Sequence, residues 1–486
     1  ATWHTGTVEP TEGVGSSGDL YLDYTTGNIY HRESDSWYYR MNVYGLERCT
    51  VTLRVVATAD GEQADLTTVE GAAVMIDDDT PISLGSTDAE GEIQYTTSED
   101  ESFNVVVSKK FFNTSEYNVT IDADNDDGTT FDLELPPQIF IPDRSNNQIV
   151  RIDDMTGSDR TVFGGDGVLG VFYLDGPTWV TVDYDRGYIY VADGNQYAFD
   201  DTTILRFSDF PPRAEDVAFV TDDAPTIEIS SVHWQADESF VMVSQIAVAD
   251  DGFYCVDPFE DSDYGSRMLF FESPNAPFGG LYNTLSSASY GSLRGVTVLP
   301  DGRILFVEAG SPDIARVGIA ESFTDIGAPQ PFFGSSVNLY YGDTSSDELR
   351  YPTTVHVSHD EQYVYISDTG SSETDVTGDE YHRLARYDLN DDGTGSSRAN
   401  YGHVDDLDGM NEEGEFYYPI ILDVLPDNRI YVMSHQGDAT SDEVDRLIRI
   451  DSFNEGEENW TVYAPEGSEE LLLDYYDYGY YFQIMD

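Results

Sequence analysis

The fold of most of the chain is decided by the stretch Val180-Thr181-Val182-Asp183-Tyr184-Asp185-Arg186-Gly187-Tyr188-Ile189-Tyr190-Val191-Ala192-Asp193. An apolar strand is followed by a turn rich in Asp and Gly, and then by a second apolar strand. The same shape returns at Ile246–Asp257, Val296–Val307, Val355–Asp368, Leu422–His435 and Leu471–Asp486. The repeat gives units of roughly 58 residues, with turns marked by Asp185, Asp251, Asp301, Asp360, Asp427 and Asp477.

Many of these units add a third strand-like segment, such as Thr203–Phe207 or Arg383–Tyr387. A period of roughly 40–60 residues with about four strands per unit is typical of a β-propeller. We therefore expect an all-β chain in which residues 137–486 form a propeller of six blades, with seven as the alternative. Ile139–Asp153 and Leu471–Asp486 are expected to share one blade, which closes the ring with both ends of the unit.

The pattern V-x-V-x-x-D-G-x-I-Y-V-A-D, followed by I-x-R-F, resembles the repeats of NHL and YVTN-like propellers. The resemblance covers residues 137–486. It implies a propeller fold. It also makes a metal site conceivable, because propeller lactonases and hydrolases hold a metal ion with Asn and Asp ligands.

Residues 1–45 contain a predicted β-hairpin. Leu20 and Leu22 alternate with polar neighbours, Thr26-Gly27-Asn28 supplies a turn, and Ile29-Tyr30 begins the returning strand. An isolated hairpin is marginally stable. We therefore expect a partner to cover its aromatic side chains, which are Trp3, Tyr21, Tyr30 and Trp37.

The string G-D-L-Y-L-D-x-x-T-G-x-I-Y at Gly18–Tyr30, followed by Trp37, resembles a short module near the N-termini of tailed-virus tail fibres and similar appendage proteins. The resemblance implies that residues 1–45 attach the chain to a virion and assemble it with further copies of itself. An ordinary hairpin is the alternative interpretation.

Residues 46–136 are predicted to form a small β-sandwich, because strand-like stretches recur there with turns between them. Gly71-Ala72-Ala73-Val74 and Thr87-Asp88-Ala89-Glu90-Gly91 resemble the carboxypeptidase-regulatory-like sandwich. That family implies a stalk or spacer, sometimes a glycan binder, without catalysis. The expected strands are Thr50–Ala57, Ala73–Ile76, Ile93–Thr96, Phe103–Ser108 and Tyr117–Ile121.

The chain is extremely acidic. Its 486 residues carry 23 Lys+Arg against 93 Asp+Glu, a formal net charge of −70, and only Lys109 and Lys110 are lysine. A net charge this negative excludes a general nucleic-acid binder and argues against binding to anionic lipid. Salt near 1 M shortens the Debye length to about 3 Å and removes most of the self-repulsion. We therefore infer a hypersaline environment, with an ordinary acidic secreted protein as the alternative.

The sequence has no run of 18 or more apolar residues, so no membrane span is expected. Ala1-Thr2-Trp3-His4 has neither the basic start nor the apolar stretch of a signal peptide. We therefore expect release by a route other than secretion, such as assembly into a virus particle. Cys49 and Cys255 are expected to be free thiols.

Two patterns are candidate metal sites. Several second strands end in an acidic residue, and in a propeller such strand ends lie together at one mouth of the central channel. A ring of carboxylates there could hold Ca²⁺ or Mg²⁺. The acidic residues are Asp193, Asp257, Glu308 and Asp368, and His435 takes this position in the last full unit. Asp388, Asn390 and Asp392 match the start of a calcium loop, although Ala399 stands where a bidentate Glu is needed. The alternative is that both patterns are polar turns of an acidic protein.

No nucleophile–base pair, P-loop or dinucleotide motif stands out, so we expect no enzymatic activity. The leading hypothesis is a structural virion appendage of a tailed virus of a halophilic archaeon: a tail fibre, spike or capsid turret, located on the virion surface. Its expected partners are other virion proteins and further copies of itself through residues 1–45, and a host surface glycoprotein or glycan through the propeller. Candidate contact residues in its long insertions are Trp234, Tyr282 and Tyr381. The alternatives are a metal-dependent propeller hydrolase or lactonase of a halophile, and a haloarchaeal surface adhesin.

Overall fold

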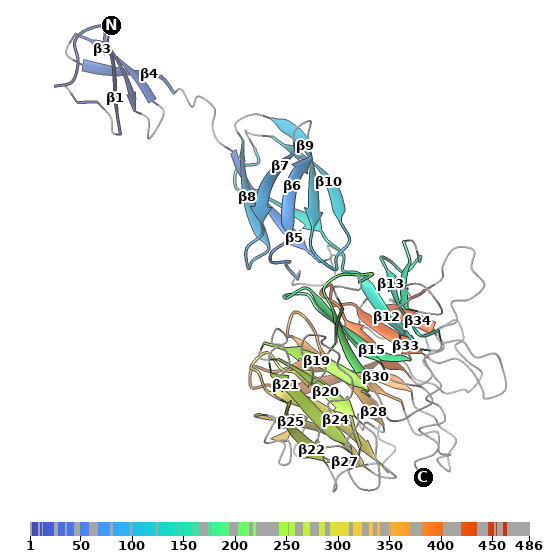
Figure 1. Ribbon diagram of the computed structural model, residues 1–486. Coiled ribbons are helices and arrows are strands. Elements are labelled where there is room, and N and C mark those ends of the chain that lie inside the picture. The colour runs from blue at the N-terminus through green and yellow to red at the C-terminus, as the bar shows by residue number, and fades with distance from the viewer. Residues whose placement is uncertain are drawn as a thin grey trace. The chain divides into compact units, whose positions relative to one another are not determined.

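A computed structural model gives the fold of the chain (Figure 1). It describes residues 2–463 with gaps, and the gaps longer than three residues are 24–27, 43–48, 58–66, 165–173, 194–202, 213–216, 220–242, 258–265, 273–280, 287–291, 323–329, 334–337, 341–348, 370–381, 402–418, 435–445 and 454–459. The chain divides into two compact units, Ala1–Pro136 and Pro137–Asp486. Within the described ranges the regular structure consists of strands, and no helix there is long and apolar enough to cross a membrane.

The N-terminal unit begins with a four-stranded sheet of order β1-β2-β3-β4. β2 and β3 pair antiparallel, with Leu22 opposite Ile29, as the hairpin prediction requires. Two strands beyond the predicted hairpin complete the sheet, because β1 adds to it in parallel and β4 adds on the other side. The bounds are β1 Trp3–Gly6, β2 Leu20–Asp23, β3 Asn28–Glu33 and β4 Ser36–Asn42.

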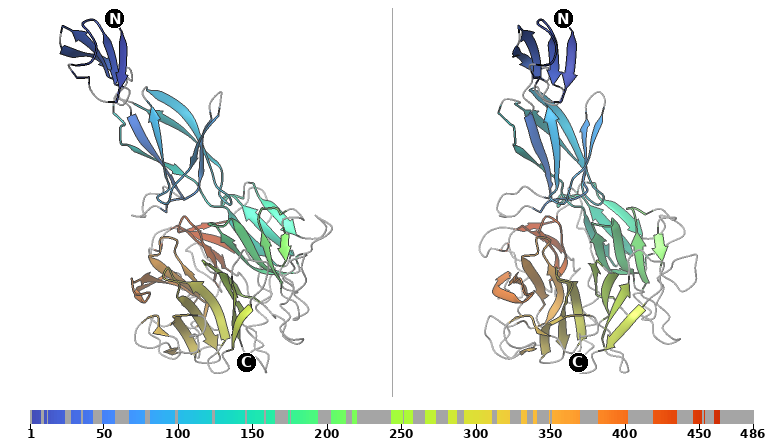
Figure 2. Two further views of the ribbon diagram at one scale, coloured as in Figure 1. Left: turned by 60° about the vertical axis from the view of Figure 1, so that its left-hand side comes forward. Right: turned by 90° about the vertical axis from the view of Figure 1, so that its left-hand side faces the viewer.

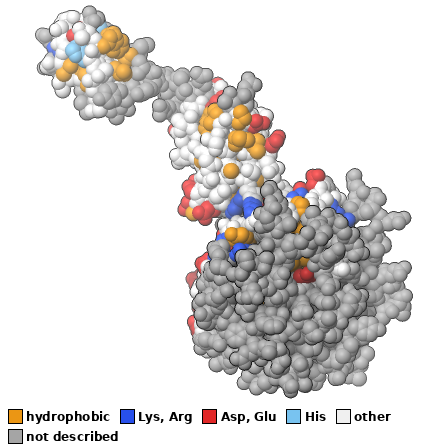
Figure 3. Space-filling view, in the orientation of Figure 1, with side chains coloured by type: hydrophobic (Ala, Val, Ile, Leu, Met, Phe, Trp, Pro, Cys, Tyr) orange, Lys and Arg blue, Asp and Glu red, His pale blue; other side chains and the backbone are white. Residues whose placement is uncertain are grey.

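β1 and β4 cover some of the aromatic side chains that a hairpin of β2 and β3 alone would leave exposed. Tyr21 and Tyr30 are buried, and Trp37 packs edge-to-face on Tyr21 with ring centroids 5.7 Å apart. Trp3 is still 57% exposed and Tyr38 is 49% exposed. Figure 3 shows hydrophobic side chains on the visible face of this sheet. The expectation that all four aromatics need an outside partner is therefore wrong for Tyr21 and Tyr30.

The remaining strands of the N-terminal unit form two sheets, of order β10-β9-β6-β7 and β11-β5-β8. Buried Val51, Leu53, Val74, Val105 and Val107 supply the core. The five strands expected from the sequence are all present, whereas β7 and β11 were not predicted. The bounds are β5 Cys49–Val56, β6 Ala73–Asp77, β7 Ile82–Ser86, β8 Glu92–Thr97, β9 Glu101–Ser108, β10 Ser115–Ile121 and β11 Thr130–Glu134.

The described part of the C-terminal unit contains six small antiparallel sheets (Figure 2), which follow the order of the chain except that β27 pairs with β25. The bounds are β12 Ile139–Asp143, β13 Gln148–Ile152 and β14 Thr161–Gly164; β15 Pro177–Asp183, β16 Tyr188–Asp193, β17 Thr203–Phe207 and β18 Val217–Phe219; β19 Gln245–Ala249, β20 Gly252–Asp257, β21 Arg267–Glu272 and β22 Leu281–Ser286; β23 Ser292–Val298, β24 Ile304–Gly310, β25 Ile314–Ala320, β26 Gln330–Pro331 and β27 Asn338–Tyr340; β28 Pro352–Val357, β29 Tyr363–Asp368, β30 Arg383–Leu389 and β31 Gly395–Tyr401; and β32 Ile420–Val424, β33 Ile430–Ser434, β34 Arg446–Ile450 and β35 Trp460–Val462.

The arrangement of these sheets is propeller-like. The first strands of consecutive sheets contact one another from β12 through β15, β19, β23 and β28 to β32, and β15 also contacts β32. The first strands therefore surround a common axis. Hydrophobic clusters fill the spaces between consecutive sheets; one of them joins Leu305 and Val317 of one sheet to Val355, Val364 and Tyr387 of the next.

The predicted turns lie between the first and second strands of their sheets. Asp185, Asp301, Asp360 and Asp427 all fall there, whereas Asp251, Asp477 and the segment 471–486 lie outside the described residues. Gly187 and Gly302 take positive φ values of 68° and 85° in two of these turns, a conformation that favours glycine. Cys49 and Cys255 are free and buried, as expected.

Candidate functional site

The acidic ends of the second strands lie at one end of the axis. Asp193 is opposite Pro177, Glu308 opposite Leu293 and Asp368 opposite Pro352, which places them beside the beginnings of the first strands. All three carboxylates are buried. Asp257 ends β20, and its side chain, like all of His435, lies outside the described residues.

Asp368 has a structural partner at this mouth. Its Oδ2 lies 3.1 Å from Arg383 Nε, and its Oδ1 accepts the Tyr351 N–H at 2.6 Å. Across the described ranges, no group of three or more His, Cys, Asp or Glu side chains is placed to hold a metal ion. The carboxylate ring for Ca²⁺ or Mg²⁺ stays a prediction.

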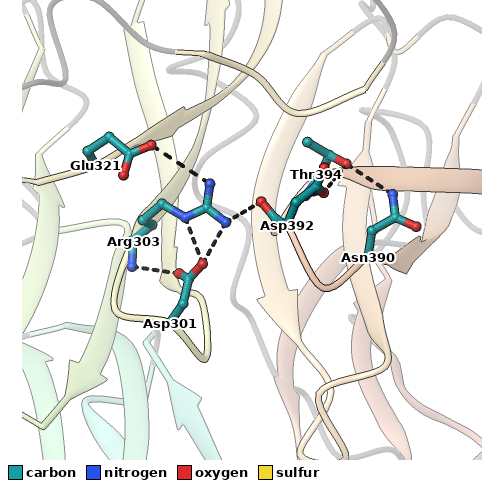
Figure 4. A network of polar contacts seen from close by, with 6 residues as sticks. All are labelled: Asp301, Arg303, Glu321, Asn390, Asp392 and Thr394. Atoms are coloured by element: carbon teal, nitrogen blue, oxygen red, sulfur yellow. Dashed lines mark hydrogen bonds and ion pairs between the residues drawn. The ribbon is translucent and has the colours of Figure 1, made fainter.

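The calcium-like loop forms the turn between β30 and β31 (Figure 4). Asn390 Nδ2 donates to Thr394 Oγ1 at 3.0 Å, and the Thr394 N–H donates to Asp392 Oδ1 at 3.0 Å. The Thr394 hydroxyl also donates to Asp392 Oδ1, at 2.5 Å, and the two bonds from Thr394, that of the hydroxyl first, lower the pKa of Asp392. Arg303 donates to the Asp392 carbonyl from the neighbouring sheet, and it also pairs with Asp301. The side chains of this turn therefore stabilise the loop and its contact with the neighbouring sheet.

The predicted contact residues fall largely outside the described ranges. Trp234 and Tyr381 lie outside them, and Tyr282 belongs to β22 with its side chain outside the described set. Their role in receptor binding stays a prediction.

The buried side chain of Gln245 links three of the first strands that surround the axis. Gln245 at the start of β19 is 1% exposed. Its Oε1 accepts the Val296 N–H at 3.2 Å and the Val355 N–H at 3.4 Å, while its Nε2 donates to the Val355 carbonyl at 2.8 Å. One amide thereby joins β19, β23 and β28. The two N–H groups that face Oε1 fix the orientation of this amide.

His356 of β28 extends these links to two further strands. Its Nε2 lies 3.2 Å from Gln245 Nε2 and 3.2 Å from the Ile421 carbonyl of β32. The ring stacks on Trp179 of β15, with centroids 6.0 Å apart and an interplanar angle of 23°. Burial and nearby His359 together lower the pKa of His356 to about 4, against the opposing effect of the contact with the Ile421 carbonyl. His356 is therefore neutral at pH 7.

A cavity of about 260 Å³ lies at the end of the axis opposite the acidic strand ends. Residues of five first strands and of the turn after β28 line it, and Gln245 and His356 are among them. The polar lining residues are Thr181, Gln245, Thr297, His356, Ser358, His359, Glu361 and Asp423.

Asp423 of β32 places a carboxylate in this cavity beside His356. Its side chain is 25% exposed, its Oδ1 accepts the Val424 N–H at 2.9 Å, and the same oxygen lies 3.7 Å from His356 Nδ1. Burial and the nearby charge of Asp427 together raise the pKa of Asp423 to about 7, against the opposing effect of the hydrogen bond from the Val424 N–H. Burial also raises the pKa of Asp427 to about 6, against the opposing charge of Arg429.

The Asp423→Asn variant is expected to gain stability over the native protein as the pH rises. A raised folded-state pKa means that the stabilising effect of the protonated carboxyl is complete below pH 3.8 and is lost as the pH rises through about 7. The stability advantage of the amide should grow by up to about 3 kcal/mol between pH 5 and pH 8. Urea unfolding in several molar NaCl at both pH values measures it. The control is Asp250→Asn, at an exposed carboxyl beside β19. An advantage that is equal at both pH values contradicts the prediction.

The sequence did not identify this cavity. His356 and His359 line the cavity together with Asp423 and Glu361. Gln245 and Asp423 belong to no motif. The only local signal was the His-x-x-His spacing at the end of β28.

No protein-family model matches the chain. No curated protein matches it either. Solved structures do resemble it. The PQQ-bound aldose sugar dehydrogenase from Streptomyces coelicolor is 16% identical with a TM-score of 0.38, over 67% of this chain and 91% of that one. A gluconolactonase from Xanthomonas campestris is 13% identical with a TM-score of 0.31, over 55% and 79%.

A third structure, the Dos1 propeller, is 10% identical with a TM-score of 0.29, over 71% of this chain and 77% of that one. Similarities this distant carry no argument about activity. The propeller-like description therefore rests on the sheet order and on the neighbouring first strands of the chain itself.

Proposed function

We propose that the chain is a structural virion appendage of a virus of a halophilic archaeon: a tail fibre, spike or capsid turret. The sheet β1–β4 attaches and oligomerises the protein, β5–β11 form a spacer, and residues 137–486 contact the host surface. The supporting observation is the N-terminal sheet. The fibre-like motif forms β2 and β3, and the sheet leaves Trp3 57% exposed and Tyr38 49% exposed. Exposed aromatic side chains of this kind are enriched at protein interfaces.

The double variant Trp3→Ser, Tyr38→Ser is expected to be monomeric, while the native chain forms oligomers in several molar NaCl. The reason is the loss of two aromatic anchors from the attachment surface. Light scattering coupled to size exclusion measures the mass. Ile82→Ser, at a residue of β7 that is 53% exposed, is the matched control. A native chain that is monomeric at micromolar concentration overturns the assembly role.

Binding to the host tests the other end of the chain. Fluorescently labelled full-length protein is expected to bind saturably to haloarchaeal cells in several molar NaCl and to compete with virus adsorption. Failure to bind any haloarchaeal strain that the virus infects contradicts the proposal.

A metal-dependent propeller hydrolase is the second candidate. The observation that favours it is the burial of Asp193, Glu308 and Asp368 together at one end of the axis. Turnover of lactones or host glycans with Ca²⁺ or Mg²⁺, lost in Glu308→Gln, would establish the enzyme in place of the appendage.

A further inference from the structure

The axial cavity carries negative charge without a cationic side chain of its own. Asp423 and Glu361 line it, and its lining contains neither Arg nor Lys. The nearby guanidinium of Arg429 pairs instead with Asp427 and Asp451, at 3.6 Å and 3.0 Å. Among the described residues, the Asp423 carboxylate therefore contacts only the Val424 N–H and the His356 ring.

His356 does not act as the counter-ion of this carboxylate. His356 Nε2 lies 3.2 Å from Gln245 Nε2, a donor, and 3.2 Å from the Ile421 carbonyl, an acceptor, so these contacts do not fix its tautomer. Burial keeps the ring neutral, so the wall beside Asp423 is a neutral imidazole. The other titratable groups that face this region are His359, Glu361, Asp427 and the buried hydroxyl of Tyr184.

We propose that the axial cavity is a binding site for a guanidinium group, with Asp423 as its counter-ion and Glu361 at its rim. A guanidinium is planar and weakly hydrated, and it offers paired donors that match a carboxylate. Na⁺ and Mg²⁺ have to shed tightly held water and need several oxygen ligands, which the described lining does not assemble.

The volume of the cavity and the partial burial of its carboxylate limit which guanidinium compounds can bind. A volume of about 260 Å³ is below the range of roughly 300–1,000 Å³ that holds drug-sized ligands. It suits one small guanidinium compound, or a single Arg side chain presented by a partner. A partly buried ion pair is screened by salt much less than a surface pair, so the site retains its attraction in concentrated NaCl.

Isothermal titration of the full-length protein with agmatine in several molar NaCl at pH 8 tests the site. We expect saturable binding that weakens at least tenfold in Asp423→Asn and is unchanged in Asp250→Asn, the exposed carboxyl at the same end of the unit. 4-Aminobutylurea, which keeps the ammonium of agmatine and replaces its guanidinium by a neutral planar urea, should bind at least tenfold more weakly than agmatine. Equal binding of 4-aminobutylurea and agmatine overturns the proposal, as does agmatine binding that Asp423→Asn leaves intact.

Two further measurements remain informative if Asp423→Asn fails to fold. In the native chain the affinity for agmatine should fall about tenfold per pH unit below the pKa of Asp423, because only the ionised carboxylate pairs with the cation. Glu361→Gln, at an exposed rim residue, should weaken binding severalfold. An affinity independent of pH between 5 and 8 contradicts the site.

The source of the guanidinium is decided by comparing agmatine with the tripeptide Gly-Arg-Gly. Tighter binding of the tripeptide identifies an Arg side chain of a partner protein, and tighter binding of agmatine identifies a free small molecule. Absence of saturable binding by both overturns the proposal.

Discussion

Transfer of the protein from several molar NaCl to about 0.1 M NaCl is expected to unfold it. The Debye length grows from below about 3 Å to about 10 Å, so repulsion among the carboxylates that make up the net charge of −70 returns. The described arginines neutralise only the carboxylates with which they pair, as in Arg54–Asp132, Arg303–Asp301 and Arg383–Asp368. Circular dichroism and melting temperature across a salt series measure the effect.

Screening is separated from solvent exclusion by a second series at 0.1 M NaCl. KCl should restore the fold as NaCl does, because the Debye length depends on ionic strength. Sucrose strengthens burial without screening charge, so it should restore the fold only in part. A protein whose spectrum and melting temperature are unchanged at 0.1 M NaCl contradicts the hypersaline interpretation.

The strands were predictable because their signals are local. In β15 and β16 an alternating or continuous apolar pattern flanks an Asp and Gly turn, and the same pattern identified the paired strands of the later sheets. The missed strands carry weaker patterns. β7 has the sequence Ile82-Ser83-Leu84-Gly85-Ser86 and buries little of it, and β11 contains only two apolar residues, Phe131 and Leu133.

The axial cavity was not predictable, because its residues meet only through the closing of the sheets about the axis. Gln245 bonds to Val355, 110 residues away, and His356 meets Ile421, 65 residues away. No spacing in the sequence encodes these contacts. The strongly acidic background also hides Asp423, since one carboxylate among 93 acidic residues gives no signal until its burial is known.

The N-terminal sheet shows a different limit. The hairpin motif placed β2 and β3 correctly, but β1 joins them in parallel through a contact that hairpin patterns do not describe. Asp19 holds β1 there by accepting the Thr2 N–H at 2.7 Å and contacting His4 Nε2 at 3.0 Å. Asp19 belongs to the motif, yet its role depends on a strand that lies before the motif.

Gln245→Leu is expected to destabilise the C-terminal unit by at least about 3 kcal/mol. Leucine keeps the approximate volume but leaves the Val296 N–H, the Val355 N–H and the Val355 carbonyl buried without their partner. Each unsatisfied buried backbone group costs about 1–3 kcal/mol. Urea unfolding in several molar NaCl measures the free energy, and Gln330→Leu, at an exposed residue of β26, should change it by less than about 0.5 kcal/mol.

Gly295→Ala disturbs the same hydrogen bonds of Gln245 from the neighbouring strand β23. A Cβ at Gly295 would lie 2.6 Å from Gln245 Oε1 and 3.0 Å from the Thr353 carbonyl, so Gly295→Ala must displace the amide or the strand. Gly302→Ala, where a Cβ meets nothing within 4 Å but φ is 85°, separates backbone strain from this clash. If Gln245→Leu and Gly295→Ala both unfold with native stability, the amide does not hold the first strands together. If both lose stability and Gly302→Ala loses less, the packing of β19, β23 and β28 depends on this one buried side chain.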